Sequence, residues 1–148
     1  MKHTIIVPDA NVAVKILHAE ADTEQARALF RSCAEHGHKI LAPEHFLYEV
    51  MNVCQRVTVG ADAVLDFYEA LRASILTVVS PNRETWKRAE DMVHDGHPSS
   101  GFPSIYDSIY HALALDAGGV FITADKRHVA KTHQHGGVML LSDWTDET

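Results

Sequence analysis

Short runs of apolar, often β-branched residues alternate along this chain with longer stretches of helical periodicity. The runs span residues 4–7, 39–42, 75–79, 120–123 and 138–141. Runs of this length and composition are typical of strands that are buried on both faces. Strands that alternate with helices are joined by crossovers, which give a parallel sheet covered by helices on both sides. The pattern therefore predicts an α/β domain with a central parallel sheet of about five strands.

Helices are predicted in every interval between these runs. Pro43 stands at the start of one of them, a position where proline is well tolerated. Gly37 and Gly118 stand where glycine commonly ends a helix. Ser80–Asn82 is expected to cap a further helix that turns Trp86, Ala89 and Val93 inward.

Length and composition limit the possible classes of protein. A chain of 148 residues can bury enough apolar surface to fold without disulfides, and we predict one domain over residues 1–148. The net charge of −7 excludes a general basic coat for nucleic acid. It does not exclude a nucleic-acid enzyme, because bound cations can reverse the local charge. The N-terminal apolar run is too short for a signal peptide or membrane span, and two isolated cysteines imply no disulfide framework, so we expect a cytoplasmic protein without membrane association.

Four acidic residues occupy positions that such a sheet would bring together. Asp9 and Asp125 each follow a predicted buried strand, at its carboxyl end. Glu49 and Asp107 lie near the first turns of helices that could begin at the same edge. Ligands of open parallel sheets bind outside the carboxyl ends of the strands. We therefore expect the four acids to converge on one rim.

Each acid also has a structural explanation when it is considered alone. Asp9 could cap the helix that follows it. Asp107 lies three residues after Ser104, which resembles a capping box, and it faces the positive end of its helix dipole. Glu49 adjoins an apolar helix face, where a carboxylate must be paired or bind a metal if it points inward. If Glu49 points to solvent it needs no explanation, and the spacing leaves both possibilities open.

Carboxylates that share one pocket need a compensating charge. Two of them about 4 Å apart repel by about 4 kcal/mol at an effective dielectric near 20. A hard divalent cation with oxygen ligands, Mg²⁺ or Mn²⁺, would relieve this repulsion. Such a site suits phosphoryl chemistry, because the ion polarises a phosphodiester and lowers the pKa of water. The sequence contains no Walker lysine loop and no G-x-G-x-x-G motif that would favour a rival mechanism.

The segments around the four acids resemble the motif blocks of the PIN-domain family, and most closely those of VapC-type toxins, the ribonuclease halves of toxin–antitoxin pairs. These blocks are residues 7–12, 43–52, 106–114 and 121–127, and the resemblance extends from Thr4 to Leu141. It implies a three-layer α/β/α sandwich and Mg²⁺- or Mn²⁺-dependent cleavage of RNA. It also implies a homodimer and inhibition by a small antitoxin protein.

The resemblance further assigns roles to individual residues. The implied catalytic and metal-binding acids are Asp9, Glu49, Asp107 and Asp125, and the implied supporting residues are Asn11 and Thr123. Some family members carry a further acid shortly after the position of Asp125, where this chain has Lys126, Arg127 and His128. We therefore expect one ion to bind well and a second only with substrate. The loop over residues 96–103 also looks longer than is usual beside such a site.

Two other functions are compatible with parts of this pattern. A catalytically inactive PIN-like module would bind RNA or a protein, although the complete set of acids counts against it. A phosphoacceptor domain would need an acid pair beside the first strand, and Asp9 stands alone there.

Several other side chains receive structural expectations. His111 and the segment 128–135 are expected to serve packing or the surface. A solvated role is favoured for Lys15 over contact with phosphates. Trp86 is expected in the core, and Trp144, in a polar tail, at a dimer or partner contact.

Overall fold

The computed structural model describes residues 4–146, and the parallel sheet predicted from the sequence is present in it. The strands are β1 (Ile5–Pro8), β2 (Lys39–Pro43), β3 (Leu76–Val79), β4 (Val120–Thr123) and β5 (Val138–Leu140). They form one five-stranded sheet in the order β3-β2-β1-β4-β5, and every neighbouring pair is parallel.

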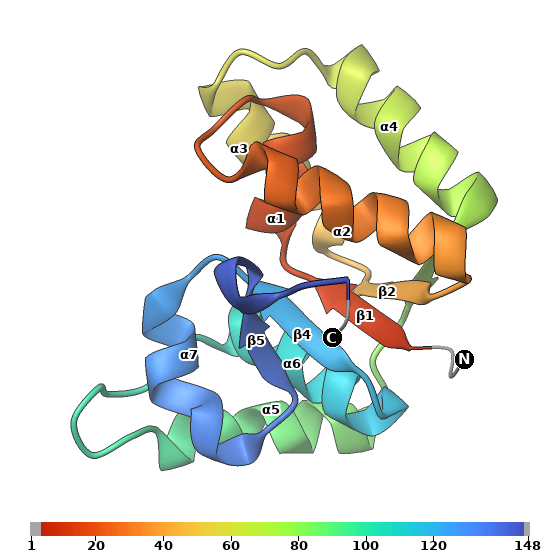
Figure 1. The fold of residues 1–148 in the computed structure, drawn as a ribbon. Helices are drawn as coiled ribbons and strands as arrows, with labels where there is room; N and C mark the ends of the chain where they lie inside the picture. The colour runs from red at the N-terminus through yellow and green to blue at the C-terminus, as the bar shows by residue number, and fades with distance from the viewer. Residues whose placement is uncertain (1–3, 147–148) are drawn as a thin grey trace.

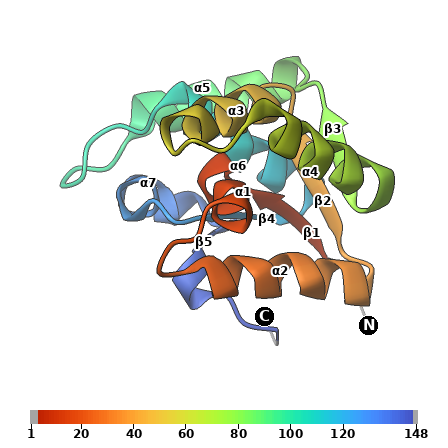
Figure 2. The same ribbon diagram turned by 90° about the horizontal axis from the view of Figure 1, so that it is seen from above.

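Helices cover both faces of this sheet (Figures 1 and 2). They are α1 (Ala10–Leu17), α2 (Thr23–His36), α3 (Phe46–Arg56), α4 (Ala61–Ser74), α5 (Arg83–Asp95), α6 (Ile105–Ala117) and α7 (Lys126–Thr132). In Figure 1, α1 to α4 lie above the sheet and α5 to α7 lie below it. The central helix of the lower layer is α6, which contacts β1, β2 and β4 and packs along α5. This is the three-layer α/β/α arrangement expected from the sequence.

The connections explain why the helices divide in this way. From β1 the chain moves outward to β2 and β3, and it then returns to the other side of β1 to form β4 and β5. Because parallel crossovers are right-handed, reversing the direction of travel places the later helices on the opposite face. The reversal falls between β1 and β4, where Pro8 pairs with Ile122. The carboxyl ends of these two strands therefore flank the position where ligands bind in open α/β sheets.

Local start and stop signals set most helix boundaries as predicted. Gly37 and Gly118 end α2 and α6 in the left-handed conformation, each at φ 70°. The side chain of Asn82 accepts a hydrogen bond from the Thr85 N–H at 2.9 Å and caps α5. The Ser104 hydroxyl accepts one from the Asp107 N–H at 3.1 Å and caps α6.

The prediction that a helix begins at Pro43 was wrong. Pro43 is the last residue of β2 and pairs with Val79 of β3. Residues 44 and 45 form a turn, and α3 begins at Phe46. A proline favours extended backbone in the residue before it, so the same residue type suits the end of a strand as well as the start of a helix.

The inward orientation predicted for Trp86 was also wrong, since this side chain is 46% exposed. The buried stripe of α5 consists of Thr85, Ala89 and Met92, so Ala89 faces inward as predicted, whereas Thr85 and Met92 are buried in place of Trp86 and Val93. On this side α5 packs along α6. The indole of Trp86 is left on the surface beside the start of α6.

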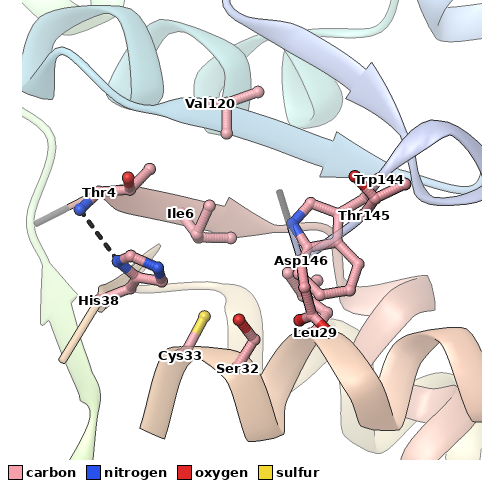
Figure 3. A pocket seen from close by; sticks show the side chains of 10 residues that line it. All are labelled: Thr4, Ile6, Leu29, Ser32, Cys33, His38, Val120, Trp144, Thr145 and Asp146. Atoms are coloured by element: carbon pink, nitrogen blue, oxygen red, sulfur yellow. Dashed lines mark hydrogen bonds between the residues drawn. The ribbon is translucent and has the colours of Figure 1, made fainter. Parts of the chain in front are cut away.

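Trp144 and Lys15 are buried, contrary to their predicted surface roles. Trp144 is 7% exposed, and its carbonyl accepts a hydrogen bond from the Gln25 side chain of α2 at 2.7 Å. Figure 3 shows it closing a cavity of about 50 Å³ between α2 and the sheet. Lys15 forms ion pairs with Glu20 at 2.7 Å and Asp22 at 2.9 Å. These ion pairs connect α1 to the turn that follows it. Within residues 4–146, no helix is both long enough and apolar enough to cross a membrane.

Candidate active site

Asp9 follows β1 directly and points into the space between the ends of β1 and β4. It occupies the N-cap position of α1, yet its side chain makes no capping hydrogen bond to that helix. Instead, the Thr123 hydroxyl donates to its Oδ2 atom at 2.8 Å, and its own N–H donates to the Ile122 carbonyl at 2.8 Å. The residue is 5% exposed. The capping explanation for Asp9 therefore fails, and its carboxylate is a buried charge at the reversal point of the sheet.

Thr123 and Asn11 connect the ends of the two central strands. Besides donating to Asp9, the Thr123 hydroxyl accepts a hydrogen bond from the Asp125 N–H at 3.0 Å. The Asn11 side-chain oxygen accepts one from the Ala124 N–H at 3.4 Å. Asp125 in turn caps α7 by accepting from the Arg127 N–H at 2.9 Å. The two predicted supporting residues thus hold the segment that carries Asp125 against the segment that carries Asp9.

Glu49 is partly exposed but is paired within the protein, which decides the question that its spacing left open. The buried hydroxyl of Tyr110 donates to its Oε1 atom at 2.9 Å. The Nε2 atom of His45 lies 2.9 Å from the same oxygen, although this close approach is not aligned as a hydrogen bond. Glu49 is thereby held by one residue of α6 and by one from the turn that precedes its own helix.

Asp107 reaches the site from the first turn of α6, whose start is fixed by the Ser104 cap. Burial and the negative charges of Asp125 and Glu49 raise the pKa of its carboxyl group, and the positive charge of Lys131 in α7 lowers it. Tyr110 lies three residues further along α6, on the same face of the helix. One helix therefore supplies both an acid of the site and the hydroxyl that holds another acid.

The pKa values of Asp9 and Asp107 show that these two carboxylates interact electrostatically with each other and with Glu49 or Asp125. Burial raises the pKa of Asp9 from 3.8 to about 7, the charges of Asp107 and Glu49 act in the same direction, and the Thr123 hydrogen bond opposes them. Burial also raises the pKa of Asp107, and the charges of Asp125 and Glu49 add to it. The pKa of Tyr110 is raised by burial, by Glu49 and by the charges of Asp9 and Asp107. The expected convergence of the four acids on one rim is therefore present.

The chemistry of this donor set fits a hard divalent cation. Within residues 4–146, no three acidic, histidine or cysteine side chains form a ready-made metal cluster. The four acids nevertheless offer only oxygen donors, and a nearby cation would lower the pKa values that burial and mutual repulsion raise. These are the ligands that Mg²⁺ and Mn²⁺ prefer.

Sequence reasoning missed Tyr110, His45 and Lys131. Two of them stood at informative spacings, since Tyr110 follows Asp107 by three residues and His45 precedes Glu49 by four. At these spacings side chains share one face of a helix. Lys131 had no such signal, because its approach to Asp107 depends on how α7 is placed against α6.

The histidines expected to serve packing do so in two cases. His111 and His128 are buried, and their Nδ1 and Nε2 atoms lie 3.3 Å apart. The Nε2 atom of His111 lies 2.6 Å from the Gly136 carbonyl, so it is the donor of that hydrogen bond. This pair joins α6 to α7 and to the turn before β5.

A parallel sheet with one buried and three partly exposed carboxylates near its reversal point defines an α/β domain built around an acidic site. The PIN domain model matches residues 6–133, and the chain belongs to the PIN domain family. This confirms the family expected from the sequence. No curated protein sequence matches the chain.

Solved structures share this fold at low sequence identity. One is VapC20 of Mycobacterium tuberculosis, described as a Sarcin-Ricin loop cleaving toxin. It is 15% identical to this chain, with a TM-score of 0.65, and the match covers 84% of this chain and 94% of VapC20. VapBC2 of Rickettsia felis, bound to a DNA fragment from its promoter, is 9% identical with a TM-score of 0.68 over 93% and 97%. FitAcB of Neisseria gonorrhoeae is 15% identical with a TM-score of 0.57 over 94% and 99%.

Proposed function

We propose that this protein is a divalent-metal-dependent endoribonuclease of the VapC toxin type. The observation that carries the proposal is the set of four electrostatically coupled acids at the reversal point of a PIN-domain sheet. Mg²⁺ or Mn²⁺ would be held by Asp9, Glu49, Asp107 and Asp125. When bound, the ion would neutralise the carboxylates, polarise a phosphodiester and lower the pKa of an attacking water.

The protein's own groups would position the reactants. Thr123 fixes the Asp9 carboxylate, and Tyr110 fixes that of Glu49. The partly exposed carboxylate of Glu49 would orient the water and take its proton. Attack of water in line with the bond from phosphorus to the 3′ oxygen would leave a 5′-phosphate and a 3′-hydroxyl. Lys131 lies near Asp107 and would help to balance the charge of the phosphate.

The biological setting is part of the same proposal. VapC20, a Sarcin-Ricin loop cleaving toxin with a fold like this one, supports RNA as the substrate class. We further propose that the chain forms one domain, acts in the cytoplasm as a homodimer and is inhibited by a small antitoxin protein.

Cleavage of RNA by the purified protein with Mg²⁺ or Mn²⁺ tests the proposal. We expect cleavage to disappear with EDTA, in Asp9→Asn and in Asp107→Asn. Asp116→Asn is the matched control, because Asp116 lies on the same helix as Asp107 but pairs with Arg88 of α5 at 2.7 Å. This control should cleave like the wild type.

Two outcomes would contradict the proposal. Cleavage that survives removal of divalent metal would show that the acids are not a metal site. An intact, folded wild type that binds Mg²⁺ and RNA but cleaves no RNA, ribosomal RNA included, would indicate the inactive binding module.

A further inference from the structure

Exposed aromatic side chains gather beside the acidic site. Tyr106 is 65% exposed and directly precedes Asp107, and Trp86 lies nearby on α5. Together with Ile105 and His45 they line a hollow of about 400 Å³. The rings of His45 and Tyr106 meet edge to face at 6.1 Å. Because His45 also lies 2.9 Å from Glu49, the hollow opens next to the acids.

A second hollow continues the first one along α5. It measures about 610 Å³, shares Trp86 and Ile105 with the first, and adds Arg83, Lys87 and His94. The two hollows together form one groove, called the α5 groove below. It leads from the acids past two exposed rings to a group of basic side chains.

The outer hollow has more basic than acidic side chains, unlike the whole chain. The protein carries a net charge of −7, yet Arg83 and Lys87 stand one helical turn apart on either side of Trp86. Within residues 4–146, neither of their side chains forms an ion pair or a hydrogen bond with another residue. Glu90 lines this outer hollow, and Glu44 lines the inner one, where it accepts a hydrogen bond from the Ser80 hydroxyl at 2.8 Å. The outer part of the groove therefore presents two unpaired cations beside an exposed indole.

We propose that the α5 groove binds unpaired nucleotides of the RNA next to the cleaved phosphodiester. Bases stack on Tyr106 and Trp86, and backbone phosphates contact Arg83 and Lys87. This inference rests on the proposed ribonuclease function and specifies its substrate as single-stranded at the site of cleavage. Aromatic platforms combined with a basic groove are the general means of binding single strands.

The same features argue against a protein surface as the occupant. An apolar protein segment would cover Trp86 and Tyr106 but would also remove water from Arg83 and Lys87 without supplying a charge to pair with them. A phosphate backbone supplies that charge at regular intervals while leaving its bases free to stack. The order of acids, rings and cations along the groove therefore fits a nucleic-acid strand.

Binding can be tested separately from cleavage. We would measure fluorescence anisotropy of a short labelled single-stranded RNA on the Asp107→Asn protein with Mg²⁺, so that no cleavage intervenes. Adding Trp86→Ala is expected to weaken binding about ten-fold, the loss of one stacked base. Adding Arg83→Gln with Lys87→Gln should make the slope of log K against log salt less steep by about 1.4, since a single strand gives about 0.7 per phosphate contact. Phe102→Ala is the matched control, because Phe102 is 66% exposed but lines neither hollow.

A direct readout of stacking comes from tryptophan fluorescence. Trp86 is the exposed member of the two tryptophans, and Trp144 is buried between α2 and the sheet (Figure 3). Added RNA should quench the emission of the wild type, and Trp86→Phe should remove most of that quenching. These readouts do not depend on turnover, so a protein that binds RNA through the groove but never cleaves it would refute the proposed function alone.

Three results would overturn the inference. Trp86→Ala could leave single-stranded RNA binding unchanged, it could weaken duplex binding equally, or sedimentation could show that it dissociates a dimer while RNA binding is retained. The last result would identify the groove as an interface between two copies of the chain. Binding is compared at protein concentrations where all variants sediment with the same mass, so that a lost dimer is not mistaken for a lost RNA site.

Discussion

At the scale of single residues, the buried carboxylate of Asp9 lowers the stability of the folded protein at neutral pH, and it lies where the proposed metal ion would bind. Its pKa in the folded protein is about 7, against 3.8 for an unperturbed side chain, and the main cause is burial. The folded state therefore binds a proton more readily than the unfolded state between these two values. Without metal, the contribution of Asp9 to stability is complete below about pH 4 and is lost as the pH rises through 7.

The difference between the folded and unfolded pKa values of Asp9 predicts how Asp9→Asn changes stability. In EDTA at about pH 8, Asp9→Asn should raise the free energy of unfolding by roughly 2–4 kcal/mol, because one pKa unit corresponds to about 1.4 kcal/mol. The gain should shrink towards zero as the pH falls towards 4. Urea unfolding across this pH range measures it. Equal stabilisation at every pH would mean that the charge of Asp9 is not its cause.

Magnesium should reverse the advantage of this variant. The wild type is expected to gain more stability from Mg²⁺ than Asp9→Asn does, because a ligand that binds only the folded state stabilises it by mass action. Asp116→Asn serves again as the control, since it should respond to Mg²⁺ like the wild type.

The acids could be predicted from sequence, whereas the residues that hold them could not. Asp9 and Asp125 follow strands, and strand ends meet at one edge whatever the order of the strands. Tyr110 and His45 contact the Glu49 carboxylate because particular faces of their segments turn towards it. That orientation is set by tertiary packing. Lys15 was misjudged for a related reason, since its partners Glu20 and Asp22 face it only once the turn after α1 has formed.

At the scale of elements, the pair His111 and His128 couples α6 to α7. Burial lowers the pKa of His128 to about 4, the charge of His111 and that of Lys131 act in the same direction, and Asp125 opposes them. Burial also lowers the pKa of His111, and His135 adds to this effect. The unfolded histidines take up protons near pH 6.5 while the folded ones resist. Stability from this pair is complete above pH 6.5 and is lost as the pH falls towards 4.

Replacing one member of the histidine pair tests this pH dependence. His128→Phe should flatten the decline of the melting temperature between pH 6.5 and about 4, because a neutral ring no longer resists protonation there. Asp9 changes stability in the opposite direction over the same range, so the quantity to compare is the difference between variant and wild type. His133→Gln, on the surface, provides the control. A difference that does not vary with pH would contradict the argument.

The boundaries of elements were predictable where a local signal fixes them. Gly37, Gly118, Asn82 and Ser104 act through their own backbone or cap and need no tertiary context. The errors lie where two elements compete for a residue or a face. Pro43 satisfies a strand end as well as a helix start, and α5 buries Thr85 and Met92 in place of Trp86 and Val93 where it packs along α6.

At the scale of the whole molecule, one apolar core joins the two helix layers. The buried cluster includes Val12 from one layer, Ile109 from the other and Phe121 from the sheet between them. It also includes Trp144, so the C-terminal segment belongs to the core and is not an appendage. The order of strands could not be deduced from the alternating pattern, because that pattern does not say on which side of β1 the returning chain will pair.

A continuous core of this kind predicts that residues 4–146 unfold as one cooperative unit. The two tryptophans test this from opposite parts of the fold, since Trp86 lies on the outer surface of α5 and Trp144 packs against α2. Urea unfolding followed by the Trp144 emission of Trp86→Phe should have the same midpoint and slope as unfolding followed by far-UV circular dichroism. A Trp144 transition that precedes the loss of helix would show that the C-terminal segment detaches first and that the chain is not one domain in the thermodynamic sense. Coincident transitions in the presence of Mg²⁺, both shifted to higher urea, would show that a ligand at the acidic rim stabilises the C-terminal segment as well, which requires that this segment and the helices unfold together.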